Sequence, residues 1–328
     1  MADESEDPRE IPSHPRFAAD VIGHDVARSQ FMQSFASGKP HHAWMITGAM
    51  GIGKATLAYH LAWAVLATGR DAAQVERWVH ARAHPDLVVL ERQLNDAKPK
   101  KKLKSEIAVD DARSFIDFFA RTSGSGGWRV GLVDAADDLN SESANALLKL
   151  VEEPPAKCVI LLVCHAPSRV LRTLRSRCRK LPLSALTRDQ TSSILAQSPL
   201  EPAPDSKKLA EAISISGGSP GFALQIVNSA GAKAFHDFVS ARRLDAPMRA
   251  GLGNYFASRA AAQADFEVFM DLLLEWLAGQ ATRNQNSSLA KLHADLAAQR
   301  GIVSGYNLDR RTAAMDALAQ IDHALKAA

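Results

Sequence analysis

Short apolar runs alternate with helical patterns in the first half of the chain. The runs AWMIT (43–47), LVVL (87–90), WRVGLVD (128–134) and CVILLVC (158–164) have the length and composition of buried strands. The segment KATLAYHLAWAVLA, which begins at Lys54, has the pattern of a helix. Strands that alternate with helices predict a mostly parallel α/β sheet with flanking helices.

From about residue 184 the pattern changes to alanine-rich helical periodicity, with breaks predicted at QSPLEPAPD, SGGSPG and QRGIVSG. We therefore expect three domains: an α/β domain over 1–183, a small helical domain over 184–235 and a helical bundle over 236–328. A chain of 328 residues is long enough for each of them to bury a core.

Composition narrows the class of protein. Hydrophobic residues at 46% and charged residues at 23% are typical of a globular protein, and a net charge of +3 does not by itself indicate a polyanionic partner. Cys158, Cys164 and Cys178 form no CxxC pair, so we expect no metal and a reducing, cytoplasmic setting. Without an apolar leader or a run near the roughly 18 apolar residues of a membrane span, neither secretion nor membrane insertion is expected.

The stretch GAMGIGKAT (48–56) has the outline of a phosphate-binding loop, and it lies between a predicted strand and a predicted helix, as the motif requires. Glycines let the backbone N–H groups turn inward, where the helix N-terminus adds partial positive charge. A turn that needs glycine for steric reasons alone is the alternative. The residues expected at the phosphate site are Gly48, Gly51, Gly53, Lys54 and Thr56.

The groups that hydrolyse a nucleotide are incomplete in this sequence. Ala55 stands where a Ser or Thr hydroxyl would ligate magnesium. Asp134, at the end of a predicted strand, is the carboxylate that would organise the metal, and it completes the expected site. The next residue is Ala135, so the carboxylate that would act as general base is missing. The acidic pair at 137–138 fits a helix cap or a solvated turn better than catalysis. The pattern predicts a degenerate site, with ATP binding left open.

Two basic segments are candidates for contacts with anions. Arg177, in SRC, lies between a short predicted helix and a strand, and an arginine fork is what one subunit offers in trans to the γ-phosphate on its neighbour. Because four further arginines surround it, the spacing alone favours a basic helix face. Five lysines within 98–104 predict a solvated loop, with nucleic-acid contact left open.

Several stretches together resemble one family: HHAWMITGAMGIGKATLA, HPDLVVL, VGLVDAADDLNSESANALLKLVEEPP, LRSRC and SGGSPGFAL. They are similar to the clamp-loader branch of the AAA+ proteins and, within it, to the delta-prime family of bacterial DNA polymerase III. The run SANALLKLVEEPP followed by SRC is specific to this branch and its close relatives, whereas the glycine loop is not. The last third of the chain matches only in being helical.

The resemblance implies an AAA+ domain with a RecA-like parallel sheet, a small helical lid domain and a helical collar that joins five subunits in a ring. Motor subunits of the family carry Ser or Thr after the loop lysine, Glu after the strand aspartate and Arg in a sensor helix. This sequence has Ala55, Ala135 and Gly221 at those places, and Cys164 or His165 in the region of another sensor. The cysteine zinc module of some relatives is missing.

The resemblance further implies a stator that presents Arg177 in trans to ATP on a motor (gamma/tau) subunit, as a component of the DNA polymerase III holoenzyme. The delta subunit, the sliding clamp and primer-template DNA would be its other partners. No cofactor would be required, although ATP is possible at the degenerate loop, and the chain alone would lack ATPase activity. The alternatives are an active AAA+ motor in which Thr56 and Asp137 or Asp138 replace the missing groups, a P-loop kinase, and a DNA-binding protein that uses the lysine run.

Overall fold

A computed structural model of the protein describes residues 14–38, 40–95, 103–124, 126–198, 206–241, 243–257, 262–283, 286–306 and 308–326. The chain forms two compact units, one of residues 1–203 with 217–221 and one of residues 204–216 with 222–328. The division into three domains stays a prediction. Most of the lysine run, from Lys98 to Lys102, lies outside the described residues.

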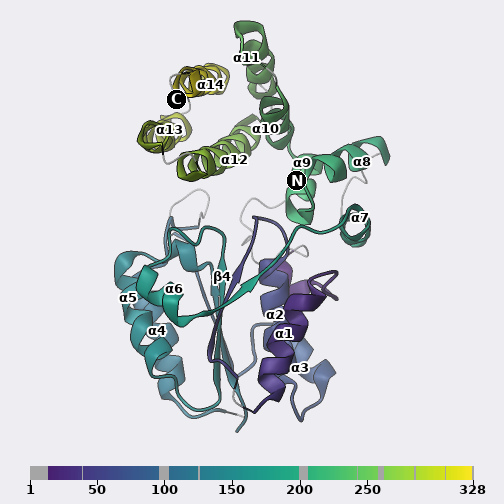
Figure 1. The fold of residues 1–328 in the computed structure, drawn as a ribbon, viewed down its shortest axis with the longest axis vertical. Coiled ribbons are helices and arrows are strands. Elements are labelled where there is room, and N and C mark those ends of the chain that lie inside the picture. Colours follow the sequence, from purple (N-terminus) through teal and green to yellow (C-terminus); the bar gives the residue numbers. More distant parts are fainter. Residues whose placement is uncertain are drawn as a thin grey trace. The chain divides into compact units, whose positions relative to one another are not determined.

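The first unit is built on a five-stranded sheet with the strand order β2-β3-β4-β1-β5. Every neighbouring pair is parallel, so the carboxyl ends of all strands lie at one edge of the sheet. The predicted α/β fold class is confirmed, and β1 to β4 lie where the apolar runs placed them (Figure 1). The strands are β1 (Ala43–Thr47), β2 (Leu87–Glu91), β3 (Arg129–Asp134), β4 (Cys158–Cys164) and β5 (Arg179–Pro182).

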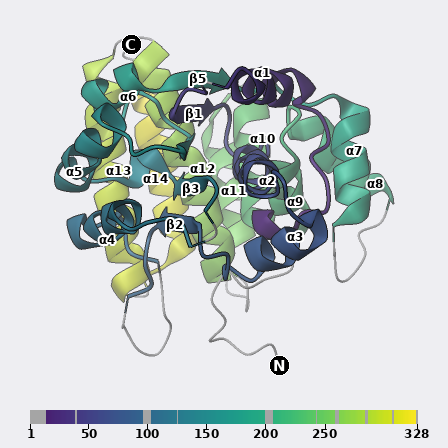
Figure 2. The same ribbon diagram turned by 90° about the horizontal axis from the view of Figure 1, so that it is seen from below.

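Alternate residues of the strands enter two separate cores, because successive side chains of a strand point to opposite faces of its sheet. In β1, Trp44 enters one core and Met45 the other. Three helices cover each face (Figures 1 and 2). The first face carries α1 (Asp25–Ala36), α2 (Lys54–Leu66) and α3 (Ala72–His80); the second carries α4 (Val109–Ala120), α5 (Ser141–Glu152) and α6 (Arg172–Arg177).

Short 3-10 helices η1 (Pro15–Phe17) and η2 (Ala136–Asp138) and the helix α7 (Arg188–Gln197) complete the regular structure described in the first unit. The side chain of Thr187 caps α7 by accepting from the Gln190 backbone N–H, while the Gln190 side chain accepts from the Thr187 N–H. This capping box fixes the start of the helix directly after the sheet region.

The second unit is helical, as predicted for this part of the chain. Large apolar residues such as Phe238, Phe269 and Leu318 form its core. Its helices are α8 (Ser206–Ile215), α9 (Pro220–Asn228), whose first two residues belong to the first unit, α10 (Ala230–Ser240), α11 (Ala246–Gly253), η3 (Asn254–Phe256), α12 (Ala262–Arg283), α13 (Ser287–Tyr306) and α14 (Arg310–Lys326). Within the described ranges, no helix has the length and apolar character needed to cross a membrane.

The break predicted at QRGIVSG is wrong, because α13 continues through this stretch to Tyr306. Leu289, Leu296 and Val303 are buried along the helix, and this apolar face outweighs the helix propensity of glycine, which is about 1 kcal/mol poorer than that of alanine. Gly301 has open space where a Cβ would lie, so this glycine serves no close approach.

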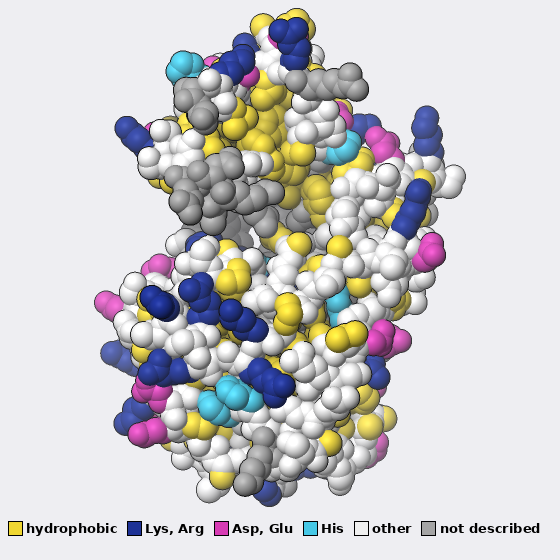
Figure 3. All heavy atoms as spheres, viewed as in Figure 1, with side chains coloured by type: hydrophobic (Ala, Val, Ile, Leu, Met, Phe, Trp, Pro, Cys, Tyr) yellow, Lys and Arg dark blue, Asp and Glu magenta, His cyan; other side chains and the backbone are white. Residues whose placement is uncertain are grey.

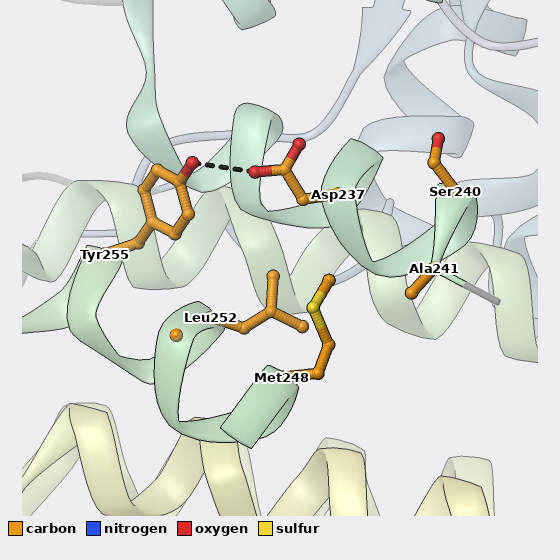
Figure 4. A pocket seen from close by; sticks show the side chains of 7 residues that line it. Asp237, Ser240, Ala241, Met248, Leu252 and Tyr255 are labelled. Atoms are coloured by element: carbon orange, nitrogen blue, oxygen red, sulfur yellow. Dashed lines mark hydrogen bonds between the residues drawn. The ribbon is translucent and has the colours of Figure 1, made fainter. Parts of the chain in front are cut away.

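A hollow on the second unit lies between α10, α11 and η3 (Figure 4). Its lining is partly apolar, with Met248 and Leu252 from α11. The Tyr255 hydroxyl donates to Asp237 Oδ2 at 2.7 Å across the hollow, which ties η3 to α10. Asp237 therefore has a structural partner within the fold.

Candidate functional site

The strand order reverses between β4 and β1. The chain passes from β1 to β2 on one side and from β4 to β5 on the other, and ligands of open α/β sheets bind at the carboxyl edge beside such a reversal. Thr47 and Cys164, the last residues of β1 and β4, are in register there. The glycine loop follows β1 directly, so the topology places it at this edge.

The backbone of the loop needs its glycines. Gly51 has φ +72° and Gly53 has φ +102°, in the left-handed region that favours glycine. Gly53 is the N-cap of α2, and Lys54 is the first residue of that helix. The buried Lys54 Nζ donates to the carbonyl oxygens of Gly48 at 2.8 Å and Ala49 at 2.7 Å. The ammonium thus lies against carbonyls of its own loop.

Residues 219–221 donate hydrogen bonds to the backbone of the glycine loop. Ser219 Oγ donates to the Met50 carbonyl oxygen at 2.8 Å, and the Gly221 N–H donates to the Gly51 carbonyl oxygen at 2.9 Å. A Cβ at Gly221 would lie 2.7 Å from the Gly51 Cα atom, closer than such atoms approach. At the place where the resemblance puts a sensor arginine in motor subunits, no side chain fits without moving the loop.

Asp134 ends β3 and lies in register with Glu91, which ends β2. Withdrawal from solvent, followed by repulsion from Glu91 and Asp138, raises the pKa of Asp134 to about 6, although Lys54 opposes the shift. Arg82 binds Glu91 through a fork, with Nη1 2.5 Å from Oε1 and Nη2 3.0 Å from Oε2. The carboxylate beside Asp134 is therefore held by a cation.

Glu91 was not among the residues predicted at the site. A signal was present in the sequence, because parallel neighbouring strands bring their last residues together and β2 ends in a glutamate just as β3 ends in an aspartate. Its partner Arg82, with φ +53°, lies between α3 and β2, where no sequence pattern pointed to the site.

The acidic pair after β3 differs from the predicted helix cap or solvated turn. Asp137 is buried, and its two oxygens accept the backbone N–H groups of His165 at 2.8 Å and Ala166 at 3.3 Å. Asp138 Oδ2 lies 3.1 Å from Arg92 Nε. A buried carboxylate needs such partners, and here they connect η2 to the segment after β4.

The groups around the loop fit a magnesium nucleotide poorly. Ala55 is half-buried and packs against the core of the first face, and its methyl group offers no ligand. Thr56 follows one position further along α2, about 100° around the helix. Ala135 is buried and carries no base. Asp134 is the member of this set that retains a metal-binding group. Among the described residues, no three His, Cys, Asp or Glu side chains are placed to hold a metal ion.

We expect Asp134→Asn to stabilise the protein at pH 7.5. Because the pKa of Asp134 is raised to about 6 in the folded state, folding takes up a proton between about pH 4 and 6, and stability falls as pH rises through that interval. Removing the ionisable group should add about 1 to 2 kcal/mol at pH 7.5 and much less at pH 4.5. Urea denaturation at both pH values measures the difference; a variant that is less stable at pH 7.5 would contradict the assignment.

Arg177 lies at the C-terminal end of α6, and its side chain is 40% exposed. Figure 3 shows Lys and Arg side chains gathered on this face over α6. Two neighbouring arginines have structural contacts: Arg175 Nη1 donates to the Pro167 carbonyl oxygen at 2.6 Å, and the Arg179 guanidinium lies 4.8 Å from the centroid of the Trp44 ring. Arg177 has contacts as well, with Glu152 Oε1 at 2.7 Å from its Nη2 atom and the Thr173 carbonyl oxygen at 3.0 Å from its Nη1 atom.

A parallel sheet of this order, with a glycine loop after β1 and an aspartate at the end of β3, is the arrangement of an AAA+ fold. The chain belongs to the family described as "DNA polymerase III, delta subunit", whose model matches residues 23–187, half of the chain. The predicted resemblance is confirmed at this level.

Relatives of known identity agree with the family. The chain is 35% identical over 189 residues to subunit delta' of DNA polymerase III from Pseudomonas aeruginosa, covering 55% of this chain and 53% of that one. It is 32% identical over 203 residues to subunit delta' from Escherichia coli, covering 60% and 58%. The chain thus spans about half the length of the curated relatives it matches.

A wider similarity extends to other subunits and to a solved structure. Subunit tau of DNA polymerase III from Escherichia coli is 30% identical over 182 residues, which are 54% of this chain and 27% of that one. The crystal structure of a protein related to the gamma subunit, from Thermotoga maritima, is 12% identical with a TM-score of 0.42, covering 89% of this chain and 98% of that one.

Proposed function

We propose that the chain is a delta-prime stator subunit of a clamp loader and acts in the cytoplasm. Motor (gamma/tau) and delta subunits are its direct partners, and it meets the sliding clamp and primer-template DNA through the assembled complex. It supplies Arg177 in trans to ATP on a neighbouring motor subunit. Its collar, from about residue 236 onward, contributes assembly contacts, and the chain needs no cofactor of its own.

The observation that carries this proposal is a glycine loop without the usual hydrolytic groups, together with an exposed arginine. The loop has the glycines and the lysine of a phosphate-binding motif, but Ala55 and Ala135 lack the hydroxyl and the base, and the Gly221 N–H donates to the Gly51 carbonyl oxygen. Arg177, in contrast, is exposed and carries a planar fork suited to a phosphate. A subunit of this kind contributes to hydrolysis elsewhere without performing it.

The alternative of an active motor needs Asp137 or Asp138 as general base. Both oxygens of Asp137 accept backbone N–H groups, and Asp138 is paired with Arg92. Both carboxylates are thus held by structural contacts within the fold, as expected of residues that fix the chain around η2. These contacts favour the stator over the motor.

We expect the isolated chain to show no ATP turnover above background, and Lys54→Ala to leave this background unchanged. The reason is the loss of both hydrolytic groups from one site. Phosphate release measures turnover, and mixing the chain with cognate motor and delta subunits and measuring the mass of the complex tests the assignment. Turnover that Lys54→Ala abolishes, or failure of the chain to enter the complex, contradicts the proposal.

A further inference from the structure

Arg177 has a partner at the end of the neighbouring helix. Its Nη2 atom lies 2.7 Å from Glu152 Oε1 in an ion pair, and its Nη1 atom donates to the carbonyl oxygen of Thr173 at 3.0 Å. A guanidinium carries five N–H donors in a fixed plane. Within the described part of the chain, one of them donates to Thr173 and the ion pair restrains Nη2, so further N–H donors can meet a ligand.

The backbones that carry this pair are fixed in place. Glu152 is the last residue of α5 and Arg177 the last of α6, and both helices enter one core through Val151 and Leu174. Cys178, directly after Arg177, is buried in the same core. The structure therefore fixes the backbone positions of Glu152 and Arg177, and the ion pair restrains their charged groups.

The restraint at the tips is weak. The side chains of Arg177 and Glu152 are 40% and 44% exposed, and water competes strongly for an ion pair of this kind. Such a pair does not withhold the arginine from a more highly charged phosphate. It does limit the orientations that the guanidinium adopts before the phosphate arrives.

We propose that Glu152 is a positioning residue for Arg177, holding the guanidinium plane so that its remaining N–H donors meet the terminal phosphate of a nucleoside triphosphate on an adjacent subunit. This inference rests on the proposed function of Arg177. A flexible arginine loses rotamer freedom when it binds, and a guanidinium oriented beforehand loses less. The gain appears as a faster reaction at the neighbouring site, because positioned groups lower the barrier.

The test uses the reconstituted complex of this chain with its motor and delta subunits. The measured quantity is the part of the ATPase rate that is lost in the complex with Arg177→Ala. We expect Glu152→Ala to lower the kcat of that fraction about threefold with little change in KM, far less than the roughly hundredfold that a 1 Å misplacement causes. Glu152→Gln should lose less, because its amide oxygen keeps a polar group beside Nη2 without the charge.

Glu153→Gln is the matched control. Glu153 is the next residue, is exposed, and makes no ion pair in the described part of the chain, so its variant should behave like the unmodified complex. The mass of each complex verifies that assembly is unchanged. In the double variant with Arg177→Ala, Glu152→Ala should cause no further loss, because the glutamate acts through the arginine.

The outcomes separate this inference from the function on which it rests. If Arg177→Ala lowers the ATPase rate but Glu152→Ala leaves it unchanged or raises it, the positioning role is wrong and the stator stands. If Glu152→Ala causes a further loss in the Arg177→Ala background, Glu152 acts independently and the inference fails. If Arg177→Ala itself has no effect, both the inference and the trans role of Arg177 fail.

Discussion

A complex that carries Arg177→Ala should assemble normally and hydrolyse ATP more slowly. An arginine supplied in trans contributes about 10³ to 10⁵ in rate at its own site, because its fork stabilises charge that develops on the transferred phosphate. Under the proposed function, other motor sites of the ring would keep their own arginines, so total ATPase should fall by a fraction and clamp loading by more if the sites fire in a coupled sequence. Steady-state ATPase and clamp-loading rates measure both effects.

Two further variants define the chemistry. Arg177→Lys should restore little activity, because an ammonium keeps the charge but not the planar fork. Arg172→Ala, at the exposed start of the same helix, should behave like the unmodified chain. Stability should change by no more than about 1 kcal/mol in Arg177→Ala, since the ion pair with Glu152 is exposed. If the complex with Arg177→Ala hydrolyses ATP and loads clamps at the unmodified rates, Arg177 has no trans role and is one residue of a basic surface.

The fold of the first unit could be predicted because its central strands β1, β3 and β4 are buried over almost their whole length. The run AWMIT is β1 from Ala43 to Thr47, and CVILLVC is β4 from Cys158 to Cys164. A strand that feeds two cores must be apolar at successive positions, and this makes it conspicuous in the sequence. The end of α13 was predicted less well, because a glycine on an open helix surface resembles a terminator until the packing of the opposite face is known.

The candidate site was predicted where a residue type carries its own chemistry. The glycines and Lys54 follow from the loop motif, in which Ala55 is a gap, and Ala135 is a second gap after the strand aspartate. What the sequence could not reveal are contacts between segments far apart in the chain. Glu91 meets Asp134 only through the sheet register, and Glu152 meets Arg177 only through the packing of α5 on α6.

The helical unit offers a second large effect at Gly231, in the first turn of α10. A Cβ at this position would lie 1.8 Å from the Asp265 carbonyl oxygen of α12, so the two helices touch there. The Asp265 side chain also holds the start of α10, where its Oδ1 accepts from Ser229 Oγ and from the Ala230 N–H, both at 2.9 Å. Gly231→Ala should push α10 from α12 and destabilise the unit by about 3 kcal/mol.

Hydrogen exchange resolved along the chain measures this loss, with faster exchange expected in α10 and α12 and unchanged exchange in the strands of the first unit. Gly251→Ala is the matched control, because Gly251 lies in α11 with nothing within 4 Å of the position of a Cβ. That variant should be neutral or gain up to about 1 kcal/mol from helix propensity. If the collar supplies the assembly contacts, Gly231→Ala should also weaken entry into the complex while Gly251→Ala should not. Equal protection of α10 in the two variants would show that the close approach at Gly231 does not hold the unit together.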